Sequence, residues 1–217
     1  MGYEVKSSVE DSDLVEKRRG QIVAAATKLF SQHGFFRTTI KDIAGLAGIS
    51  QGLIYQYVSD KEDVLLLVLL DVLDGYQREV PAALSPGTDP FARCLDAIRA
   101  YAKVVDKRRK ATVLAYRSTQ SLSENRRAII QNRELETNQI LAGVIGECIE
   151  AGYLRAVNLD ILTYQIVMMA HAWALKHWFF KSRFSLDEYV EHHIDLVFHG
   201  VLTETGRAQW EATRKKT

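Results

Sequence analysis

The sequence predicts an all-α protein of about nine helices, and three observations support this class. Apolar residues recur at spacings of three and four along most of the 217-residue chain, as they do on one face of a helix. No stretch shows the strict alternation of apolar and polar residues that marks a half-buried strand. All three prolines fall within residues 81–90, which indicates one loop rather than many helix breaks.

The apolar spacing gives the expected helices in chain order. They cover residues 16–33, 40–46, 50–57, 60–79, 90–107, 109–120, 123–151, 158–180 and 186–203. Three residue pairs match or resemble capping boxes at helix starts, namely Thr39 with Asp42, Ser59 with Glu62, and Ser185 with Glu188. Asp89 before Pro90 predicts another start, and Gly152 predicts the end of a long helix. Short helices precede residue 60 and long ones follow, which indicates a small N-terminal module and a larger helical domain.

The composition is that of a soluble globular protein, with 47% apolar and 25% charged residues. No apolar run reaches the roughly 20 residues of a membrane span, so no membrane partner is expected. The polar, acidic start is not a signal peptide, and residues 1–15 are expected to form a flexible tail. Cys94 and Cys148 lie in apolar helical segments, which favours buried, reduced thiols in a cytoplasmic protein.

The net charge of +1 conceals an uneven distribution of charge. Residues 17–61 contain seven basic and two acidic residues, whereas residues 1–16 contain one basic and five acidic residues. A basic block can be merely a solvated face. It becomes a nucleic-acid footprint when a reading motif lies within it.

Residues 39–57 have the pattern of a helix-turn-helix motif. Ile43 lies on the apolar side of a short first helix, and Gly48 allows a tight turn. Ser50 can cap the second helix, whose Ile54 faces the core. Such a motif presents the exposed side of its second helix to the major groove of DNA.

The expected DNA contacts divide into base and phosphate contacts. Glutamine can pair with an adenine edge, and an aliphatic side chain can contact a thymine methyl group. Hydroxyl and ammonium groups can bind phosphate oxygens. Such contacts fix the register of the protein on the DNA without reading the base sequence. The predicted DNA-binding residues are Thr39, Lys41, Ser50, Gln51, Gly52, Leu53, Tyr55, Gln56, Tyr57 and Lys61. A plain αα-hairpin is the alternative, but the glycine turn, the basic block and the tyrosine-rich face together favour DNA binding.

Residues 19–65 resemble the DNA-binding module of the TetR family of bacterial repressors. The matching positions are Ile22, Ala25, Leu29, Phe30, Gly34, Phe35, Thr38, Thr39, Ile40, Ile43, Ala44, Ala47, Gly48, Ile49, Ser50, Gly52, Ile54, Tyr55, Tyr57, Lys61 and Glu62. Val58 departs from the family's more frequent phenylalanine. The resemblance implies a homodimer on a palindromic operator in double-stranded DNA, with a ligand cavity and the dimer interface beyond residue 60. We accordingly expect a DNA-binding domain at 16–61, a regulatory domain at 62–205 and a C-terminal tail at 206–217.

The last two predicted helices are apolar over wide faces, more than one neighbouring helix would cover. In the TetR family the corresponding helices form a four-helix bundle across a two-fold axis. The residues predicted for this dimer interface are Ile166, Met169, Trp173, His192, Leu196, Val197 and Gly200. The alternative is that the two helices pack only within one chain.

The family also implies an effector pocket, and such pockets are mostly apolar with a few polar groups. Its expected wall is Leu67, Tyr76, Phe91, Tyr101, Tyr116, Tyr164, Met168 and Trp173. The expected inward polar residues are Arg117, Asn132, Glu136 and His171. The C-terminal half resembles TetR regulators that sense acyl-CoA thioesters, so the expected effector is an apolar small molecule with a polar or anionic head.

Other function classes find little support in the sequence. His171 and His177 are six residues apart, and His192 and His199 are seven apart, whereas metal pairs on a helix need spacings of three or four. Nucleophile elbows, phosphate-binding glycine loops and zinc-protease patterns are missing. No catalytic residue, metal or cofactor is therefore expected. A ligand-responsive repressor is the favoured function; an activator or dual regulator with the same head is the alternative, and a helical enzyme or metal-binding protein is a remote one.

Overall fold

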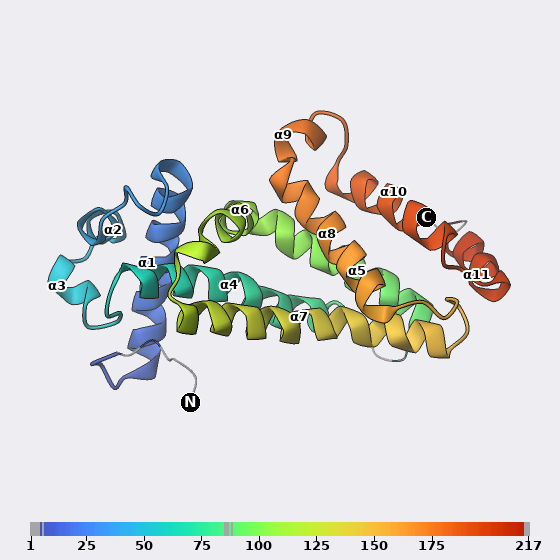
Figure 1. Ribbon diagram of the computed structural model, residues 1–217, viewed down its shortest axis with the longest axis horizontal. Helices are drawn as coiled ribbons and strands as arrows, with labels where there is room; N and C mark the ends of the chain where they lie inside the picture. Colours follow the sequence, from blue (N-terminus) through green and yellow to red (C-terminus); the bar gives the residue numbers. More distant parts are fainter. Residues whose placement is uncertain (1–4, 6, 85–86, 88, 215–217) are drawn as a thin grey trace. The chain divides into compact units, whose positions relative to one another are not determined.

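The structure is a computed structural model, and it describes residues 5, 7–84, 87 and 89–214. The described residues form α-helices, one short 3-10 helix, and no strand beyond an isolated bridge between Leu154 and Leu202, which confirms the all-α class (Figure 1). The elements are α1 (Ser12–His33), α2 (Ile40–Ala47), α3 (Gln51–Ile54), α4 (Lys61–Ala82), α5 (Pro90–Lys107), α6 (Arg109–Ser118), η1 (Thr119–Ser121), α7 (Glu124–Glu150), α8 (Leu159–Leu175), α9 (His177–Phe180), α10 (Leu186–His199) and α11 (Glu204–Arg214).

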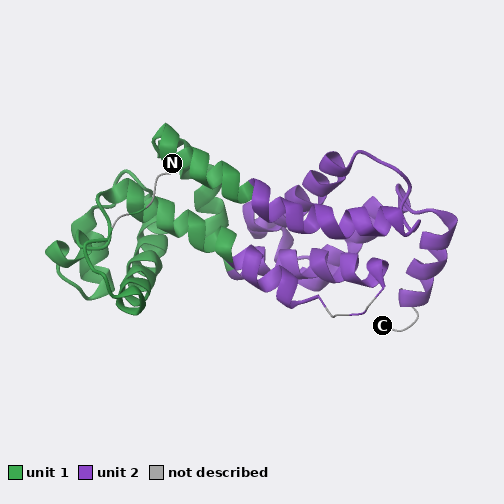
Figure 2. Ribbon diagram, turned by 90° about the horizontal axis from the view of Figure 1, so that it is seen from below, with its two compact units in different colours: residues 1–74, 108–134 green, residues 75–107, 135–217 purple. Residues whose placement is uncertain are grey.

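The chain divides into two compact units, which Figure 2 shows in different colours. Unit 1 contains residues 1–74 and 108–134, and unit 2 contains residues 75–107 and 135–217. Helices α4 and α7 each begin in unit 1 and continue into unit 2. The predicted boundary between residues 61 and 62 divides the chain differently, because it assigns α4 from Glu62 onwards and all of α7 to the regulatory domain.

In unit 1, α1 packs against both α2 and α6. The core of this unit is formed by Ile22 and Phe30 of α1, Ile43 of α2 and Ile54 of α3, all nearly inaccessible to solvent. Burying such side chains contributes about 1.5–3 kcal/mol each. The short helices α2 and α3 are therefore held against α1 by apolar packing rather than by their own helical propensity.

The predicted flexible tail at residues 1–15 is wrong for the residues that the structure describes. Helix α1 begins at Ser12, because the Asp11 carboxylate accepts hydrogen bonds from the backbone N–H groups of Asp13 and Leu14. Before it, Val5 is buried, and the backbone N–H of Ser8 donates to the carbonyl of Gln56 at 2.8 Å. Residues 1–4 and 6 lie outside the described part.

Two of the three predicted capping boxes are confirmed, at Thr39 with Asp42 and at Ser185 with Glu188. The third is wrong in its partners. At the start of α4 it is the Asp60 carboxylate that accepts from the Asp63 N–H at 2.9 Å, while Asp63 accepts from the Ser59 N–H at 2.8 Å. The cap is therefore shifted by one residue.

In unit 2, α5 packs against α8 and α10. Phe91 at the start of α5 contacts the rings of Tyr153, Phe198 and Trp210. Trp210 belongs to α11, so the predicted C-terminal tail is wrong for residues 206–214, whereas residues 215–217 lie outside the described part. Helix α11 was missed because it contains one large apolar residue among polar ones.

The predicted helix over 158–180 is interrupted at Lys176, whose φ of −114° and ψ of 25° are not helical.

The two cysteines are also in unit 2, where Cys94 of α5 and Cys148 of α7 are fully buried. Hydrogen bonding with Cys148, together with burial, raises the pKa of the Cys94 thiol well above its ordinary value. None of the described helices is both long and apolar enough to cross a membrane.

Candidate functional site

The helix-turn-helix motif is built from α2, α3 and the turn between them. Gly48 ends α2 in the left-handed region, with φ of 70°, where a residue with a Cβ would be strained. Ser50 then caps α3 by accepting a hydrogen bond from the Leu53 N–H at 3.1 Å. Ile54 is completely buried. These contacts fix the orientation of α3 on α2, and therefore fix which of its side chains face solvent.

The exposed side of α3 carries most of the predicted DNA-binding residues. The side chains of Ser50, Gln51, Tyr55 and Gln56 are exposed, and Leu53 is half-buried. An added Cβ at Gly52 would meet no atom within 4 Å, so this position leaves open space through which the backbone can approach a ligand. On α2, the start is marked by Thr39 and Lys41, which are both exposed. The Thr39 hydroxyl donates to Asp42, and this hydrogen bond lowers the pKa of the Asp42 carboxyl.

Tyr57 is not part of the exposed face, which corrects the sequence prediction. Its relative exposure is 2%, compared with 50% for Tyr55. The reason is that α3 ends at Ile54 and residues 55–57 form a turn. The Tyr57 side chain points into the core, and its carbonyl accepts two hydrogen bonds from the guanidinium of Arg19, at 3.1 and 3.2 Å.

Lys61 is also engaged within the chain, contrary to the predicted phosphate contact. Its ammonium donates to the carbonyl oxygens of Phe35, Phe36 and Thr38, at 3.0, 3.2 and 3.0 Å. An ammonium has three donors, so these bonds use all of them. Lys61 thus ties the start of α4 to the loop between α1 and α2.

Arg19 is a residue that the sequence reasoning missed. Besides holding the Tyr57 carbonyl, it donates to the carbonyl of Val5 at 2.6 Å. It therefore joins the N-terminal segment to the end of the reading motif. Nothing in the local spacing indicates this role, because its partners lie 14 and 38 residues away.

A polar centre lies within the otherwise apolar helices of unit 2. The hydroxyls of Tyr76 and Tyr101 lie 3.4 and 3.3 Å from Nε2 of His171. The two phenol rings stack with centroids 4.3 Å apart. Burial lowers the pKa of His171 to about 4, so the imidazole is neutral at pH 7. Three of the predicted pocket residues are thus brought together.

A second buried polar group lies on the neighbouring stretch of α7. Asn138 is 5% exposed, and among the described groups neither its Oδ1 nor its Nδ2 has a hydrogen-bond partner. Gln77 donates to Glu136 at 3.3 Å, so this part of α7 runs beside the turn of α4 that carries Tyr76. Asn138 follows Glu136 by two residues, so its side chain leaves α7 on nearly the opposite side, away from the exposed Glu136.

The other predicted pocket residues are not gathered with this centre. Phe91 is in the aromatic core with α11, and Trp173 is buried and donates to Asp106 at 2.6 Å. The predicted inward orientation is wrong for three polar residues, which are exposed, namely Arg117, Asn132 and Glu136. Tyr116, Tyr164 and Met168 are also exposed, and Leu67 is half-buried. Leu67, Tyr116, Arg117 and Asn132 moreover belong to unit 1.

The predicted interface residues also fall into two groups. Leu196 is 73% exposed, His192 and Gly200 are exposed and Val197 is half-buried, whereas Ile166, Met169 and Trp173 are buried within the chain. The second group is therefore a correction, since intrachain packing already covers these side chains. The apolar side chains that α8 exposes are Ile161, Tyr164 and Met168, at spacings of three and four, so they form one stripe.

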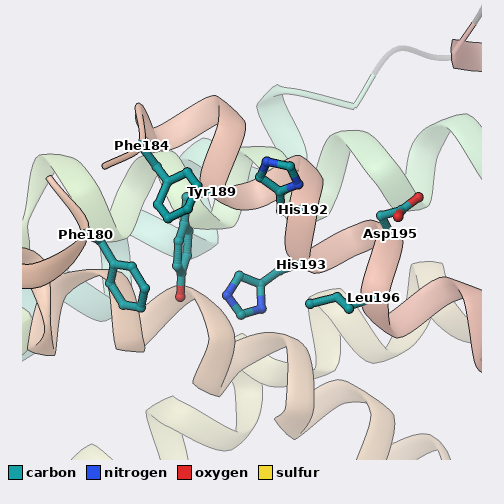
Figure 3. Close-up of a pocket in the computed structure, with 7 residues that line it drawn as sticks. All are labelled: Phe180, Phe184, Tyr189, His192, His193, Asp195 and Leu196. Carbon is teal, nitrogen blue, oxygen red and sulfur yellow. The ribbon is translucent and has the colours of Figure 1, made fainter. Parts of the chain in front are cut away.

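A surface pocket of about 420 Å³ lies along α10 and the segment before it. Figure 3 shows the side chains of Phe184, Tyr189, His192 and His193 around it. Burial, with a smaller contribution from His192, lowers the pKa of His193. Among the described residues no group of three metal-ligating side chains is close enough to bind an ion.

Comparison with known proteins agrees with this arrangement. Residues 22–68 match the family model described as bacterial regulatory proteins of the tetR family, and residues 87–201 match a tetracyclin repressor-like C-terminal domain. The transcriptional regulator HbdR of Aromatoleum sp. (strain CIB) is 52% identical over 203 residues, covering 94% of this chain and 89% of that protein. The transcriptional repressor KstR2 of Mycobacterium tuberculosis (strain ATCC 25618 / H37Rv) is 26% identical over 167 residues, covering 76% and 82%.

Solved structures have the same fold. The ketosteroid transcriptional regulator KstR2 of Mycobacterium tuberculosis superposes with a TM-score of 0.69 at 22% identity, covering 91% of this chain and 99% of that one. A tetR-family regulatory protein from Rhodococcus RHA1 gives a TM-score of 0.76 at 21% identity, covering 87% and 99%. The family models and the 52% identity over nearly the whole chain establish that this protein belongs to the TetR family of helix-turn-helix transcriptional regulators.

Proposed function

We propose that the protein is a transcriptional repressor that binds a palindromic operator as a homodimer and leaves it when a small apolar effector binds. The observation that best supports this proposal is the exposed side of α3, which Ser50 and Ile54 hold in a fixed orientation. A helix held in this way can enter the major groove and present side chains to base edges. The repressor sign is favoured by the relatives named KstR2, which are described as repressors.

On DNA, some of the exposed residues would contact base edges and others would contact phosphates. Gln51, in the first turn of α3, suits an adenine edge, and Leu53 suits a thymine methyl group. The hydroxyls of Thr39 and Tyr55 and the ammonium of Lys41 suit phosphate oxygens. Lys61 and Tyr57 have no direct role in this proposal, because their side chains are engaged within the fold.

Dimerisation would use the exposed apolar stripe of α8 together with the exposed side of α10. Ile161 is 70% exposed and Leu196 is 73% exposed, and exposed apolar side chains in a row favour an interface. A two-fold interface uses the same surface on both copies, which matches the symmetry of a palindromic site.

The effector would bind in unit 2 near the centre formed by Tyr76, Tyr101 and His171. These groups are neutral, and their O–H or N–H groups can donate hydrogen bonds to an uncharged oxygen such as a carbonyl. An acyl-CoA thioester is one molecule with such a carbonyl next to an apolar chain.

The DNA-binding part of the proposal is tested by selecting bound duplexes from a random library with the purified full chain. We expect an inverted repeat, bound at two chains per site with a dissociation constant of about 10⁻⁸–10⁻¹¹ M. Selection of no sequence, or of a single half-site bound by one chain, would refute it. In a deletion strain, transcription from the promoter that contains the site should rise; a fall would identify an activator.

The effector part is tested with the selected duplex and a panel of acyl-CoA thioesters, each beside its free acid and free CoA. A thioester that releases the DNA and raises the melting temperature supports the proposal. Substituting Tyr101→Phe should weaken that release. Release by free acids or by CoA alone would show that the thioester carbonyl is not what is recognised.

A further inference from the structure

Arg126, in the first turn of α7, makes contacts within unit 1 that neither the DNA face nor the effector centre uses. Its side chain is nearly buried, with 9% relative exposure. The guanidinium donates to Asp63 at 2.9 and 3.0 Å, to Asp60 at 2.7 Å and to Glu62 at 3.0 Å. One side chain on α7 thus binds three carboxylates, one just before α4 and two in its first turn.

The carboxylates are themselves tied to the backbone on both sides. The second oxygen of Asp63 accepts from the Ser59 N–H at 2.8 Å, and Glu62 accepts from the Ser123 N–H at 2.9 Å. Asp63 is completely buried, so its charge depends on Arg126 for compensation. Removing one partner of such a buried pair is strongly destabilising, because it leaves an uncompensated charge in the interior. This network, Asp60, Glu62, Asp63 and Arg126, is called the Arg126 clamp below.

The residue between the clamped carboxylates points to the reading head. Lys61 donates to the carbonyls of the loop between α1 and α2. Asp60, Glu62 and Asp63 therefore contact α7, whereas Lys61 between them contacts the head. The contacts with α7 and with the head together fix the angle between α4 and the helix-turn-helix motif that precedes it.

We propose that Arg126 is a positioning residue that sets the angle of the reading head on α4 and α7, and thereby the half-site spacing that a dimer accepts. This inference rests on the proposed function, because spacing has meaning only for a dimer on two half-sites. One additional base pair moves a half-site by about 3.4 Å and turns it by about 35° around the DNA axis. A head with a fixed angle rejects such a displacement, whereas a loosely held head accepts it.

The test uses the full chain with Arg126→Met combined with Asp63→Leu, since replacing a buried ion pair by apolar groups often preserves the fold. A second variant, Arg126→Lys, retains the charge but lacks the planar fork that holds several carboxylates. The matched control is Arg155→Met, an exposed arginine of unit 2. Circular dichroism and size-exclusion chromatography establish that each variant folds and has the oligomeric state of the wild type.

Each protein is then titrated against duplexes that carry the selected half-sites at spacings from two base pairs shorter to two longer. We expect the wild type and Arg155→Met to bind one spacing at least about tenfold more tightly than its neighbours, a difference of about 1.4 kcal/mol. The clamp variants should bind neighbouring spacings within about threefold of their best one. Their half-site sequence and their salt dependence should be unchanged, because Arg126 is too buried to contact phosphate.

The outcomes separate the inference from the proposed function. If folded clamp variants keep the wild-type spacing preference, or lose affinity equally at every spacing, Arg126 is merely structural and the inference is wrong. If the wild type itself binds isolated half-sites as well as paired ones, the proposed dimeric function fails first. Broadened spacing in both clamp variants, with an unchanged half-site, supports the positioning role.

Discussion

The ammonium nitrogen of Lys61 lies 4.6 Å from the centroid of the Phe35 ring and donates a 3.0 Å hydrogen bond to the carbonyl oxygen of the same residue. A cation over an aromatic face is stabilised by the ring quadrupole. The three carbonyls that it reaches belong to the loop between α1 and α2. Lys61, which the sequence predicts to contact a DNA phosphate, therefore stabilises the fold of the DNA-binding head.

This relationship leads to a prediction for Lys61→Met. The substitution removes three charge-assisted hydrogen bonds, so we expect the free energy of unfolding to fall by about 2–4 kcal/mol. DNA affinity should fall only as far as the folded fraction falls, and the slope of log affinity against log salt should be unchanged, because no phosphate contact is lost. Lys103→Met, at an exposed position of α5, is the control. A reduced salt slope in folded Lys61→Met would instead indicate a phosphate contact.

Gln51 is expected to read a base. Gln51→Ala should reduce discrimination at one base pair of each half-site by about 1–3 kcal/mol, while the other positions keep their preference. Binding-site selection with the variant measures this directly, and Gln131→Ala, at an exposed position of α7, serves as control. An unchanged selected sequence would mean that Gln51 does not reach the base edges.

Tyr55 and Tyr57 provide a matched pair that differs in exposure. Tyr55→Phe should weaken binding to all sequences by about 0.5–1.5 kcal/mol, because a neutral hydroxyl bond to phosphate is lost. Tyr57→Phe should leave the affinity of the folded protein unchanged, since that side chain is buried. Titrations on specific and random duplexes distinguish the two. Equal losses in both variants would contradict the orientation of the turn after α3.

His171 predicts a dependence of stability on pH. Its pKa is about 4 in the folded chain and 6.5 ordinarily, so between these values the unfolded chain binds the proton and the folded chain does not. Protonation then favours unfolding: stability is complete above pH 6.5 and is lost as the pH falls towards 4, by up to about 3 kcal/mol. Urea unfolding across this range should show a smaller loss for His171→Asn. Parallel curves for the two proteins would exclude this contribution.

Gly206 is required for the docking of α11. A Cβ added at Gly206 would overlap the carbonyl oxygen of Tyr153. The backbone N–H of Gly206 donates to the hydroxyl of Thr203 at 3.0 Å, which holds the glycine in this place. Gly206→Ala should therefore displace α11 from Phe91 and Phe198 and lower the free energy of unfolding by about 1–3 kcal/mol, as overpacking does. Gly143→Ala, whose Cβ would meet nothing within 4 Å, should be neutral or stabilising. Similar melting temperatures for both variants would contradict this account.

The sequence allowed the reading motif to be predicted because its signals are local. The Thr39 cap, the Gly48 turn and the buried Ile54 all lie within about four helical turns. Their order and spacing predict two short helices joined by a tight turn. The exposure of Gln51 follows from the same spacing. Helix class and most helix starts could be predicted for this reason.

The features that were missed depend on partners far along the chain. Whether Tyr57 faces solvent depends on where α3 ends, and helix ends are poorly specified by spacing. The roles of Lys61 and Arg126 come from groups more than 20 and 60 residues away. The position of α11 depends on one tryptophan that packs against α5 and α10. Such contacts arise from tertiary packing, which no single-helix pattern contains.

The buried pair Cys94 and Cys148 has a practical consequence for measuring how this protein moves. Maleimides react with exposed thiolates, whereas both of these thiols are buried and the pKa of the Cys94 thiol is raised well above its ordinary value. A cysteine introduced at the exposed Lys28 of α1 would then be the reactive position of the folded chain. A spin label attached there would report the separation of the two heads of the proposed dimer by dipolar spectroscopy, with DNA and without it, in a background that needs no prior removal of native cysteines.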